Sequence, residues 1–584
     1  MKTKYLLIAA LFFGLFLTTS CDDLFRDKPV NKLPENLIWE DPQLLDGYIL
    51  PWYRNMSHGF SVYMPTNTLL KGISREFLPW FSDQITVSKS EWFTTAYGDI
   101  LKSDMRGLQQ KSLALWTNYY EQIRSINLLL ENEKKIPAGD HKDRVLGEAH
   151  FFRAYYYYLL LQRFGGPVLM KEVYDPLSNP SKYPRASYEE TVEFIISEAR
   201  LAESYLPISY NLENTGRATK GAALMLKAKT YFWAAGKPFQ EQAKGYLGFP
   251  NDRADAMLSK AKESYDELMK LPYTLIEIKG TTQEQIKEEY RQIFLTKNSI
   301  ESIWEVQHSN SGDYADGFGH KLDREASSPF YGGTTAAYSP TQNHVDEYGM
   351  QKGKTYDPNN PYENRDYRFY ANILYDGCKY NEHIMEIHYK VVDGKEIPGS
   401  DLTPYGASET AAVSKTGYYL GKFVNEAEKI NTDPIYASKQ NYIIWRFAEV
   451  LLDYAEIDFK QGRANDALEK INRIRKRARM DELEHITWDA LMNERRVELA
   501  FEEAVFWDFL RYGTAVEKLS GATNPLKTMK IVKEEGRPVT YTISNMNRYP
   551  SRVRLFREMQ YYYSIPWDEI RFHGIDQNPG WEEV

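Results

Sequence analysis

"GEAHFFRAYYYYLLLQRFGGPVLM", residues 147–170, decides the fold class of this chain. Together with the preceding "HKDRVL" it predicts a long helix, which stops at Gly165 and Gly166, a natural C-terminal signal. The four successive tyrosines at residues 155–158 cannot share one helix face, because neighbouring positions point about 100° apart. We therefore interpret them as packing residues within an array of helices.

Helical periodicity continues on both sides of this helix. Within residues 111–135, large side chains recur every three or four positions: Leu115, Tyr119, Ile123, Ile126 and Leu130. Further helices are predicted at residues 187–206, 219–235, 252–271, 441–461 and 464–479. These segments form helix–turn–helix pairs of about 34 residues, the size of a TPR unit. The expected fold is therefore mostly α, with a scaffold of TPR-like helical hairpins.

Two segments interrupt the helical pattern. Residues 272–439 and 56–102 are rich in Gly, Pro, Asn, Asp and aromatic residues. Short strands are predicted inside the first segment at "SIWEVQ" (302–307) and "HIMEIHYKVV" (383–392). Loops of this length in a compact protein are usually functional or disordered. We expect the helices to support a loop-rich lobe with a few short strands.

The N-terminus has the features of a secretory signal peptide. Two lysines precede an apolar run at residues 5–17. This run is too short to span a bilayer, because a transmembrane helix needs about 20 apolar residues. The run ends at "TTSC", which resembles the lipobox of bacterial lipoproteins and makes Cys21 the expected acylated residue. An ordinary secreted protein with an incidental cysteine is the alternative. Asp22 and Asp23 resemble the acidic signal that exports Bacteroidetes lipoproteins to the cell surface.

Composition narrows the classes of partner. The formal net charge of −9 becomes −11 once Lys2 and Lys4 are removed, which argues against nucleic acid as a partner. Only Cys378 remains after Cys21, so no intramolecular disulfide is expected. Aromatic residues make up 14% of the chain, which permits a binding surface for amphipathic ligands such as sugars.

Several segments in order resemble one family. They are "GEAHFFRAYYYYLLLQRFGGPVLM", "GRATKGAALMLKAKTYFWA", "ESIWEVQ", "ALEKINRIRKRAR", "NERRVELAFEEAVFWDFLRYG" and "YYYSIPWDEIRFHGIDQNPGW". The chain is similar to the SusD/RagB-like family of Bacteroidetes outer-membrane nutrient-binding lipoproteins. It departs from the family pattern at Ala504, where Gly is usual, and at Phe506 and Trp507, where Arg is common.

The resemblance implies an organisation and a role. Residues 1–20 would be a lipoprotein signal peptide, 21–45 a lipidated tether, 46–299 a SusD-like N-terminal region with the TPR-like helices, and 300–584 a RagB/SusD C-terminal region with long loops and closing helices. The protein would sit on the outer face of the outer membrane as a lid over a SusC-like TonB-dependent transporter. The implied cargo is an oligosaccharide, with an oligopeptide as the alternative. No catalysis and no cofactor are implied, and a surface glycoside hydrolase is the third interpretation.

The candidate ligand-binding residues lie in the two loop-rich segments. The family commonly places a Trp-bearing stacking loop in the first, and here the candidates are Arg75, Trp80, Asp83 and Trp92. A second platform usually follows the "ESIWEVQ" strand, where the candidates are Tyr314, Phe318, Arg324, Phe330 and Tyr331. For Trp80 and Trp92, packing is an equally weighted alternative. We expect Trp304 to be a core residue, because it shares a strand face with Val306.

Other motifs give little support for chemistry. His383 and His388 are five residues apart, which neither helix nor strand spacing brings to one face, so a zinc site is not expected. Asp313 and Asp316 leave a structural calcium ion open, without the full ligand pattern of an EF-hand. The charges of "NERRVELAFEEAVFWDFLR" (493–511), taken as one helix with a buried apolar stripe, are expected to form ion pairs between helices.

Overall fold

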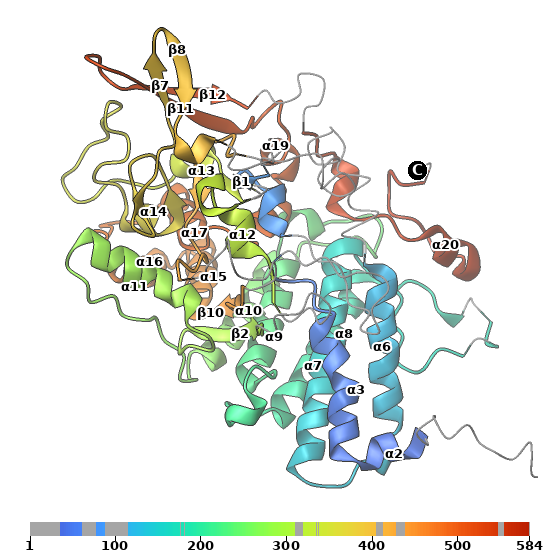
Figure 1. The fold of residues 1–584 in the computed structure, drawn as a ribbon. Coiled ribbons are helices and arrows are strands. Elements are labelled where there is room, and N and C mark those ends of the chain that lie inside the picture. The colour runs from blue at the N-terminus through green and yellow to red at the C-terminus, as the bar shows by residue number, and fades with distance from the viewer. Residues whose placement is uncertain are drawn as a thin grey trace, which may run out of the picture.

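The protein is a helical scaffold joined to a loop-rich lobe (Figure 1). The computed structural model describes residues 35–60, 77–87, 115–175, 177–179, 182–309, 319–333, 336, 338–403, 413–427, 438–546 and 554–582. The scaffold contains α2 (Glu35–Glu40), α3 (Pro42–Arg54), α6 (Trp116–Glu131), α7 (Asp140–Phe164), α8 (Tyr188–Tyr205), α9 (Lys220–Ala234), α10 (Ala254–Leu268), α11 (Gln283–Leu295), α15 (Phe447–Lys460), α16 (Ala464–Arg477), α17 (Trp488–Glu498) and α18 (Ala504–Tyr512). Successive helices pack side by side as hairpins, so the expectation of a mostly α, hairpin-based fold is confirmed.

Helix α7 runs through the centre of the scaffold and is buried on every side. Its four tyrosines at residues 155–158 are all nearly inaccessible, which confirms the packing interpretation. The Trp304 indole meets the Tyr155 ring edge to face, with 5.4 Å between centroids. Trp304 is only 3% exposed, so its assignment to the core is also confirmed.

Local sequence signals set the helix starts. Ser187 caps α8 with a capping box, in which its hydroxyl accepts from the Glu190 backbone N–H and the Glu190 carboxylate accepts from the Ser187 N–H. The Thr219 hydroxyl caps α9 by accepting from the Ala222 N–H. The predicted helices at 187–206 and 219–235 therefore differ from α8 and α9 by a residue at each end.

One predicted helix begins too early. Residues 441–461 were expected to be helical throughout, but Tyr442–Arg446 forms strand β10, and α15 begins only at Phe447. Strand β10 pairs antiparallel with β2 (Ser302–Val306) and is buried along its whole length. A strand that is buried on both faces has an unbroken apolar sequence, and its periodicity does not distinguish it from a buried helix.

A second correction concerns residues 493–511, which form two helices rather than one. α17 ends at Glu498 and α18 begins at Ala504, with Phe501 and Glu503 in left-handed conformations (φ 63° and 68°). Such backbone conformations are energetically unfavourable for residues other than Gly. Tertiary hydrogen bonds hold the break: the Phe501 N–H donates to Gln84 Oε1, and the Glu503 carboxylate bonds the His58 ring.

The loop-rich lobe carries short elements around the scaffold's upper end in Figure 1. Its helices are α12 (Leu322–Ala326), α13 (Gln342–Val345), α14 (Tyr367–Asn372) and α19 (Ala515–Lys518), while α20 (Trp567–His573) lies beside α6 at the edge of the scaffold. Its strands are β1 (Ile85–Thr86), β3 (Ser339–Pro340), β4 (Ile373–Leu374), β5 (Lys379–Tyr380), β6 (His383–Ile384), β7 (Tyr389–Val392), β8 (Lys395–Pro398), β9 (Tyr419–Leu420), β11 (Lys527–Glu534) and β12 (Thr540–Asn545). A four-stranded sheet of order β12-β11-β7-β8 projects from the lobe.

The predicted strand at 383–392 is divided in two. Strands β6 and β7 take its ends, while Met385 and Ile387 between them are buried in the core. The two strands belong to different sheets, because β6 pairs with β5 and β7 pairs with β8 and β11. Between them, the backbone N–H groups of Glu386 and Ile387 donate to the Asp401 and Asp376 carboxylates and not to a neighbouring strand, which interrupts the ladder.

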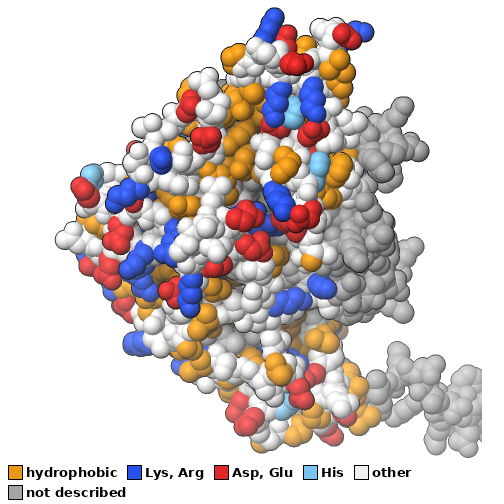
Figure 2. Space-filling model, turned by 60° about the vertical axis from the view of Figure 1, so that its left-hand side comes forward, with side chains coloured by type: hydrophobic (Ala, Val, Ile, Leu, Met, Phe, Trp, Pro, Cys, Tyr) orange, Lys and Arg blue, Asp and Glu red, His pale blue; other side chains and the backbone are white. Residues whose placement is uncertain are grey.

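The surface carries charges of both signs. Figure 2 shows Lys and Arg side chains interspersed with Asp and Glu, and hydrophobic side chains gathered toward the loop-rich lobe. None of the helices within the described residues combines the length and the apolarity needed to cross a bilayer.

Candidate functional site

Trp80 lies in the core, on the one-turn helix Leu78–Phe81, whose second residue is Pro79. Trp80 is only 3% exposed. The Phe77 and Tyr338 rings pack against it with centroid distances of 5.4 and 5.0 Å. The structure therefore agrees with the alternative interpretation, in which Trp80 packs in the core.

Asp83 is also buried, and its carboxylate already has partners. Arg496 Nη2 lies 2.8 Å from Oδ1, and the Asn524 amide donates to Oδ2 at 2.9 Å. Burial raises the pKa of Asp83, but Arg496, Asn524 and Arg554 together lower it by more, so the net pKa lies below its usual value. Asp83 is thus a charged residue that joins two distant parts of the chain.

Phe330 and Tyr331 form an exposed aromatic feature with His383. Both lie on the one-turn helix Pro329–Tyr331, which ends at Gly332 in a left-handed conformation. The Phe330 ring stacks on the His383 imidazole, with centroids 3.9 Å apart and planes 10° from parallel. Phe330 nevertheless remains 41% exposed. We call Phe330, Tyr331 and His383 the aromatic patch.

Buried polar groups fix the orientation of this patch. The His383 Nε2 atom lies 2.9 Å from Oδ2 of Asp401, a fully buried carboxylate. The Ser328 hydroxyl donates to the other carboxylate oxygen at 2.5 Å. Tyr331 donates its hydroxyl to the Tyr380 carbonyl, also at 2.5 Å. The hydrogen bond with Asp401 therefore fixes the His383 imidazole, and the stacked Phe330 ring is fixed with it.

The polar cluster beneath the patch does not have the geometry of a Ser-His-Asp triad. Ser400 Oγ lies 3.4 Å from His383 Nε2, the same nitrogen that contacts Asp401. A catalytic histidine uses one nitrogen for the serine and the other for the carboxylate. The geometry supports positioning of the imidazole rather than activation of Ser400.

The remaining candidates divide between described and undescribed residues. Arg324 lies half-buried on α12, which precedes the helix of Phe330. Cys21, Arg75, Trp92, Tyr314 and Phe318 lie outside the described residues, as do Asp313 and Asp316. The structure therefore brings Phe330 and Tyr331 together on the surface and places Trp80 and Asp83 in the interior.

The comparisons with known proteins give the family. The model described as "SusD family" matches residues 300–581, and the model described as "Starch-binding associating with outer membrane" matches residues 78–232. The chain belongs to the SusD family. The two models together cover most of the chain, including the helix of Phe330 and the helices α7 to α9.

Relatives of this SusD-family protein match over almost its whole length. A SusD-like protein from Bacteroides ovatus is 22% identical over 596 residues, covering 99% of this chain and 94% of the relative. A solved SusD-like protein from Bacteroides fragilis NCTC 9343 has a TM-score of 0.70 at 24% identity, covering 94% and 100% of the two chains. A SusD-like carbohydrate binding protein from the same strain has a TM-score of 0.68 at 21% identity, covering 92% and 99%.

A cluster of buried ion pairs in the SusD-family protein connects elements of the scaffold. Glu498 of α17 pairs with Arg446, Arg477 and Arg368, which come from three other segments. Glu494 pairs with Arg368 and Arg475. The expectation that the charges of residues 493–511 form ion pairs between helices is confirmed.

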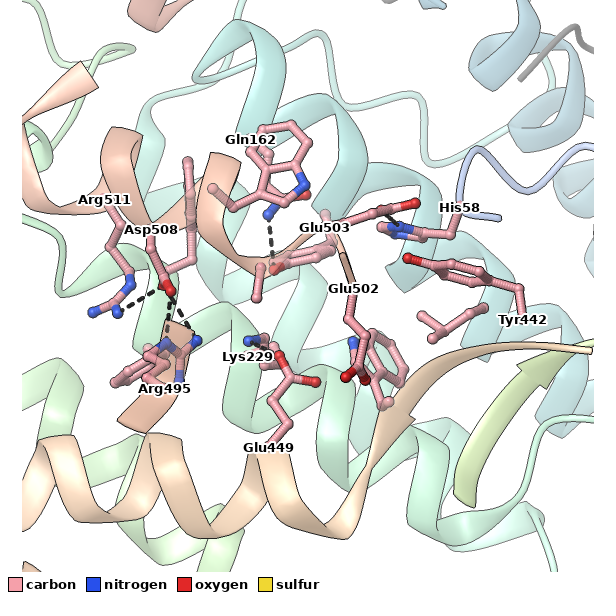
Figure 3. A pocket seen from close by; sticks show the side chains of 17 residues that line it. His58, Gln162, Lys229, Tyr442, Glu449, Arg495, Glu502, Glu503, Asp508 and Arg511 are labelled. Carbon is pink, nitrogen blue, oxygen red and sulfur yellow. Dashed lines mark hydrogen bonds and ion pairs between the residues drawn. The ribbon is translucent and has the colours of Figure 1, made fainter. Parts of the chain in front are cut away.

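A small cavity adjoins this charged region (Figure 3). Lys229 and Glu449 pair on one side of it at 2.7 Å, and Arg495 pairs with Asp508 at 2.6 Å. The cavity measures about 50 Å³, which is room for one or two water molecules and too little for a sugar ring. The cavity is therefore not a candidate site for a sugar ligand.

Sequence reasoning missed the role of His383. It was considered only as a metal ligand, together with His388. In the structure His383 pairs with Asp401 and His388 pairs with Asp376, so the two imidazoles contact different carboxylates. Phe330 and His383 are 53 positions apart, and no local spacing signals that their rings stack.

Proposed function

We propose that this protein is a non-catalytic glycan-binding receptor and that the aromatic patch is part of its binding surface. The observation that carries the proposal is the exposed Phe330 ring, held flat on His383 in a SusD-family scaffold. The C–H face of a sugar ring packs well on such a flat apolar surface. An immobilised ring also loses little side-chain entropy when a ligand binds.

Polar groups around the patch suit a ligand rich in hydroxyls. The imidazole of His383 and the hydroxyls of Ser400 and Tyr331 lie beside the Phe330 ring. Arg324, on the preceding helix, is the proposed additional donor. Arg75, Trp92, Tyr314 and Phe318 are the candidates from the loop-rich segments that the structure does not describe.

We propose a cell-surface location for the mature protein. Residues 1–20 would be removed as a signal peptide, and Cys21 would carry the acyl chains at the start of the 21–45 tether. More than one acyl chain makes such an anchor effectively permanent. The family description of outer-membrane association supports this location.

The proposed role is capture followed by delivery. Regions 46–299 and 300–584 would together hold an oligosaccharide and pass it to a SusC-like TonB-dependent transporter. The resemblance to a carbohydrate binding SusD-like structure supports the glycan over a peptide.

Affinity electrophoresis of the mature protein in gels that contain single polysaccharides tests the proposal. Retarded migration in at least one gel, with no sugar released on prolonged incubation, is the expected result. Sugar release would instead indicate a hydrolase. Unchanged migration in every gel, together with calorimetric binding of an oligopeptide mixture, would replace the glycan with a peptide ligand.

A further inference from the structure

A second pocket lies far from the aromatic patch in sequence, between α6, residues 168–183 and α20. Figure 1 shows α20 beside α6 at the edge of the scaffold. The pocket has a volume of about 280 Å³, near the lower end of the usual range for ligand sites. It is open to solvent and is large enough for a small organic ligand.

Four aromatic rings from two sides line the pocket. Trp116 and Tyr120 contribute from α6, with ring centroids 4.8 Å apart. Tyr174 and Tyr183 contribute from the opposite wall, with centroids 5.3 Å apart. The Tyr120 hydroxyl donates to the Val168 carbonyl at 2.6 Å, which fixes that ring against the wall. The π faces of such rings carry partial negative charge and attract cations.

A half-buried carboxylate closes one end of the pocket. Glu569 lies on α20, and its side chain is 34% exposed. Burial raises the pKa of Glu569, and the lowering effects of His573 and of a hydrogen bond with the Trp116 side chain do not cancel this rise. The nearest histidine nitrogen, Nε2 of His573, is 3.5 Å away, too long for a strong hydrogen bond. The other ring nitrogen, His573 Nδ1, is buried and has no hydrogen-bond partner among the described residues.

The remaining charges along the wall do not neutralise Glu569. Glu121 and Arg124 are exposed and of opposite sign. Glu172 pairs with Lys182 at 2.6 Å. A cation seated among the rings would thus meet a carboxylate whose nearest charged partner is His573 at 3.5 Å, and an anion would meet unfavourable charge at that end.

We propose that this pocket, which we call the α6–α20 pocket, binds an organic cation, with the ammonium group beside Glu569 and the carbon skeleton against the tyrosine and tryptophan rings. The ammonium could belong to an amino sugar, to a choline-like group or to a lysine side chain, which share this chemistry. The inference is independent of glycan capture, because the pocket shares no residue with the aromatic patch.

Isothermal titration calorimetry of the mature protein with four small probes tests the site. The probes are choline, glucosamine, Nα-acetyl-lysine amide and 3,3-dimethyl-1-butanol, the neutral analogue of choline. We expect at least one cation to bind with a Kd in about the millimolar range or tighter, and about tenfold more tightly than the neutral analogue. The ranking of the three cations identifies the source of the ammonium group.

Two variants place the binding in this pocket. Glu569→Gln removes the charge and Tyr174→Leu removes a π face, and each is expected to weaken the cation about tenfold with an unchanged unfolding temperature. Glu517→Gln is the matched control, because Glu517 is an exposed carboxylate on α19. Equal binding of the neutral analogue, no heat with any cation, or equal affinities of Glu569→Gln and Glu517→Gln would overturn the proposal. Glycan retardation on gels is unaffected by any of these results.

Discussion

Arg446 and Glu498 form an ion pair of 2.8 Å whose side chains are 1% and 0% exposed. Arg446 ends strand β10, and Glu498 is the last residue of α17. The same guanidinium also binds Glu301 and Glu502. The pair therefore joins the two-stranded sheet of β2 and β10 to helix α17, and the polar atoms of both partners have hydrogen-bond partners.

Replacing Glu498 with Gln is expected to destabilise the protein strongly. The substitution leaves three buried guanidinium groups short of a negative partner, and breaking a buried pair in this way typically costs about 3–5 kcal/mol. Thermal unfolding followed by circular dichroism measures the effect. Glu396→Gln is the control, because Glu396 pairs with Lys530 on the surface, where loss of a pair costs about 1 kcal/mol or less. Equal unfolding temperatures for the two variants would contradict the importance of the buried pair.

Acid is expected to unfold the protein for the same reason. Burial would raise the pKa of Glu498, but Arg477, Arg446 and Arg368 hold it well below its usual value. Burial would likewise raise the pKa of Glu456, but Arg511, Lys460 and Arg495 together lower it well below its usual value. A lowered folded-state pKa contributes stability that is present above the unfolded-state value of about 4.3 and is lost as pH falls below it.

The unfolding temperature should therefore fall steeply from about pH 5 to pH 3. The Glu498→Gln variant should show a shallower fall over the same range, since one of the carboxylates is gone. A parallel pH profile for the variant and the wild type would show that Glu498 does not titrate as the structure predicts.

Trp80→Ala is expected to lower stability rather than to affect ligand binding alone. Removal of a buried Trp side chain typically costs about 3–5 kcal/mol. The unfolding temperature measures this loss, and Phe572→Ala is the comparison, because Phe572 is 72% exposed. An unchanged unfolding temperature for Trp80→Ala would show that its ring is not part of the core in solution.

The lipid anchor can be tested with the two cysteines of the chain. Cys21→Ala should release the protein from the membrane fraction and remove the acyl mass from its N-terminal peptide in mass spectrometry. Cys378→Ala should leave both properties unchanged, because burial raises the pKa of the Cys378 thiol to about 12 and makes it unreactive. Membrane retention of Cys21→Ala would refute the anchor.

Periodicity was sufficient to predict only part of the scaffold, because α2, α3 and α11 were not predicted and α11 lies inside the segment 272–439 that was expected to be loop-rich. Helices α7, α8 and α9 have long amphipathic or apolar sequences with Ser187 and Thr219 at their starts, and such signals act locally. The strand β10 could not be predicted in this way, since its buried apolar sequence depends on pairing with β2. The break at Phe501 likewise depends on distant residues: the Phe501 N–H donates to Gln84, and Glu503 bonds His58.

The candidate site was predicted only in part, because some of its residues meet only in the folded chain. Phe330 and Tyr331 could be named from an aromatic loop after the β2 strand. His383 and Asp401, which support them, come from positions more than 50 residues later, and only the folded chain brings them together. Whether an aromatic side chain in a loop is exposed, as Phe330 is, or buried, as Trp80 is, is decided by tertiary packing.

The most direct test of the account compares Phe330→Ala with Phe572→Ala in affinity electrophoresis, using the polysaccharide that retards the wild-type protein most. Both variants remove an exposed phenylalanine, and only Phe330 belongs to the aromatic patch. We predict that Phe330→Ala weakens binding by about threefold to tenfold, as expected for loss of one aromatic contact, while Phe572→Ala binds like the wild type. Wild-type retardation of a correctly folded Phe330→Ala variant would contradict the account.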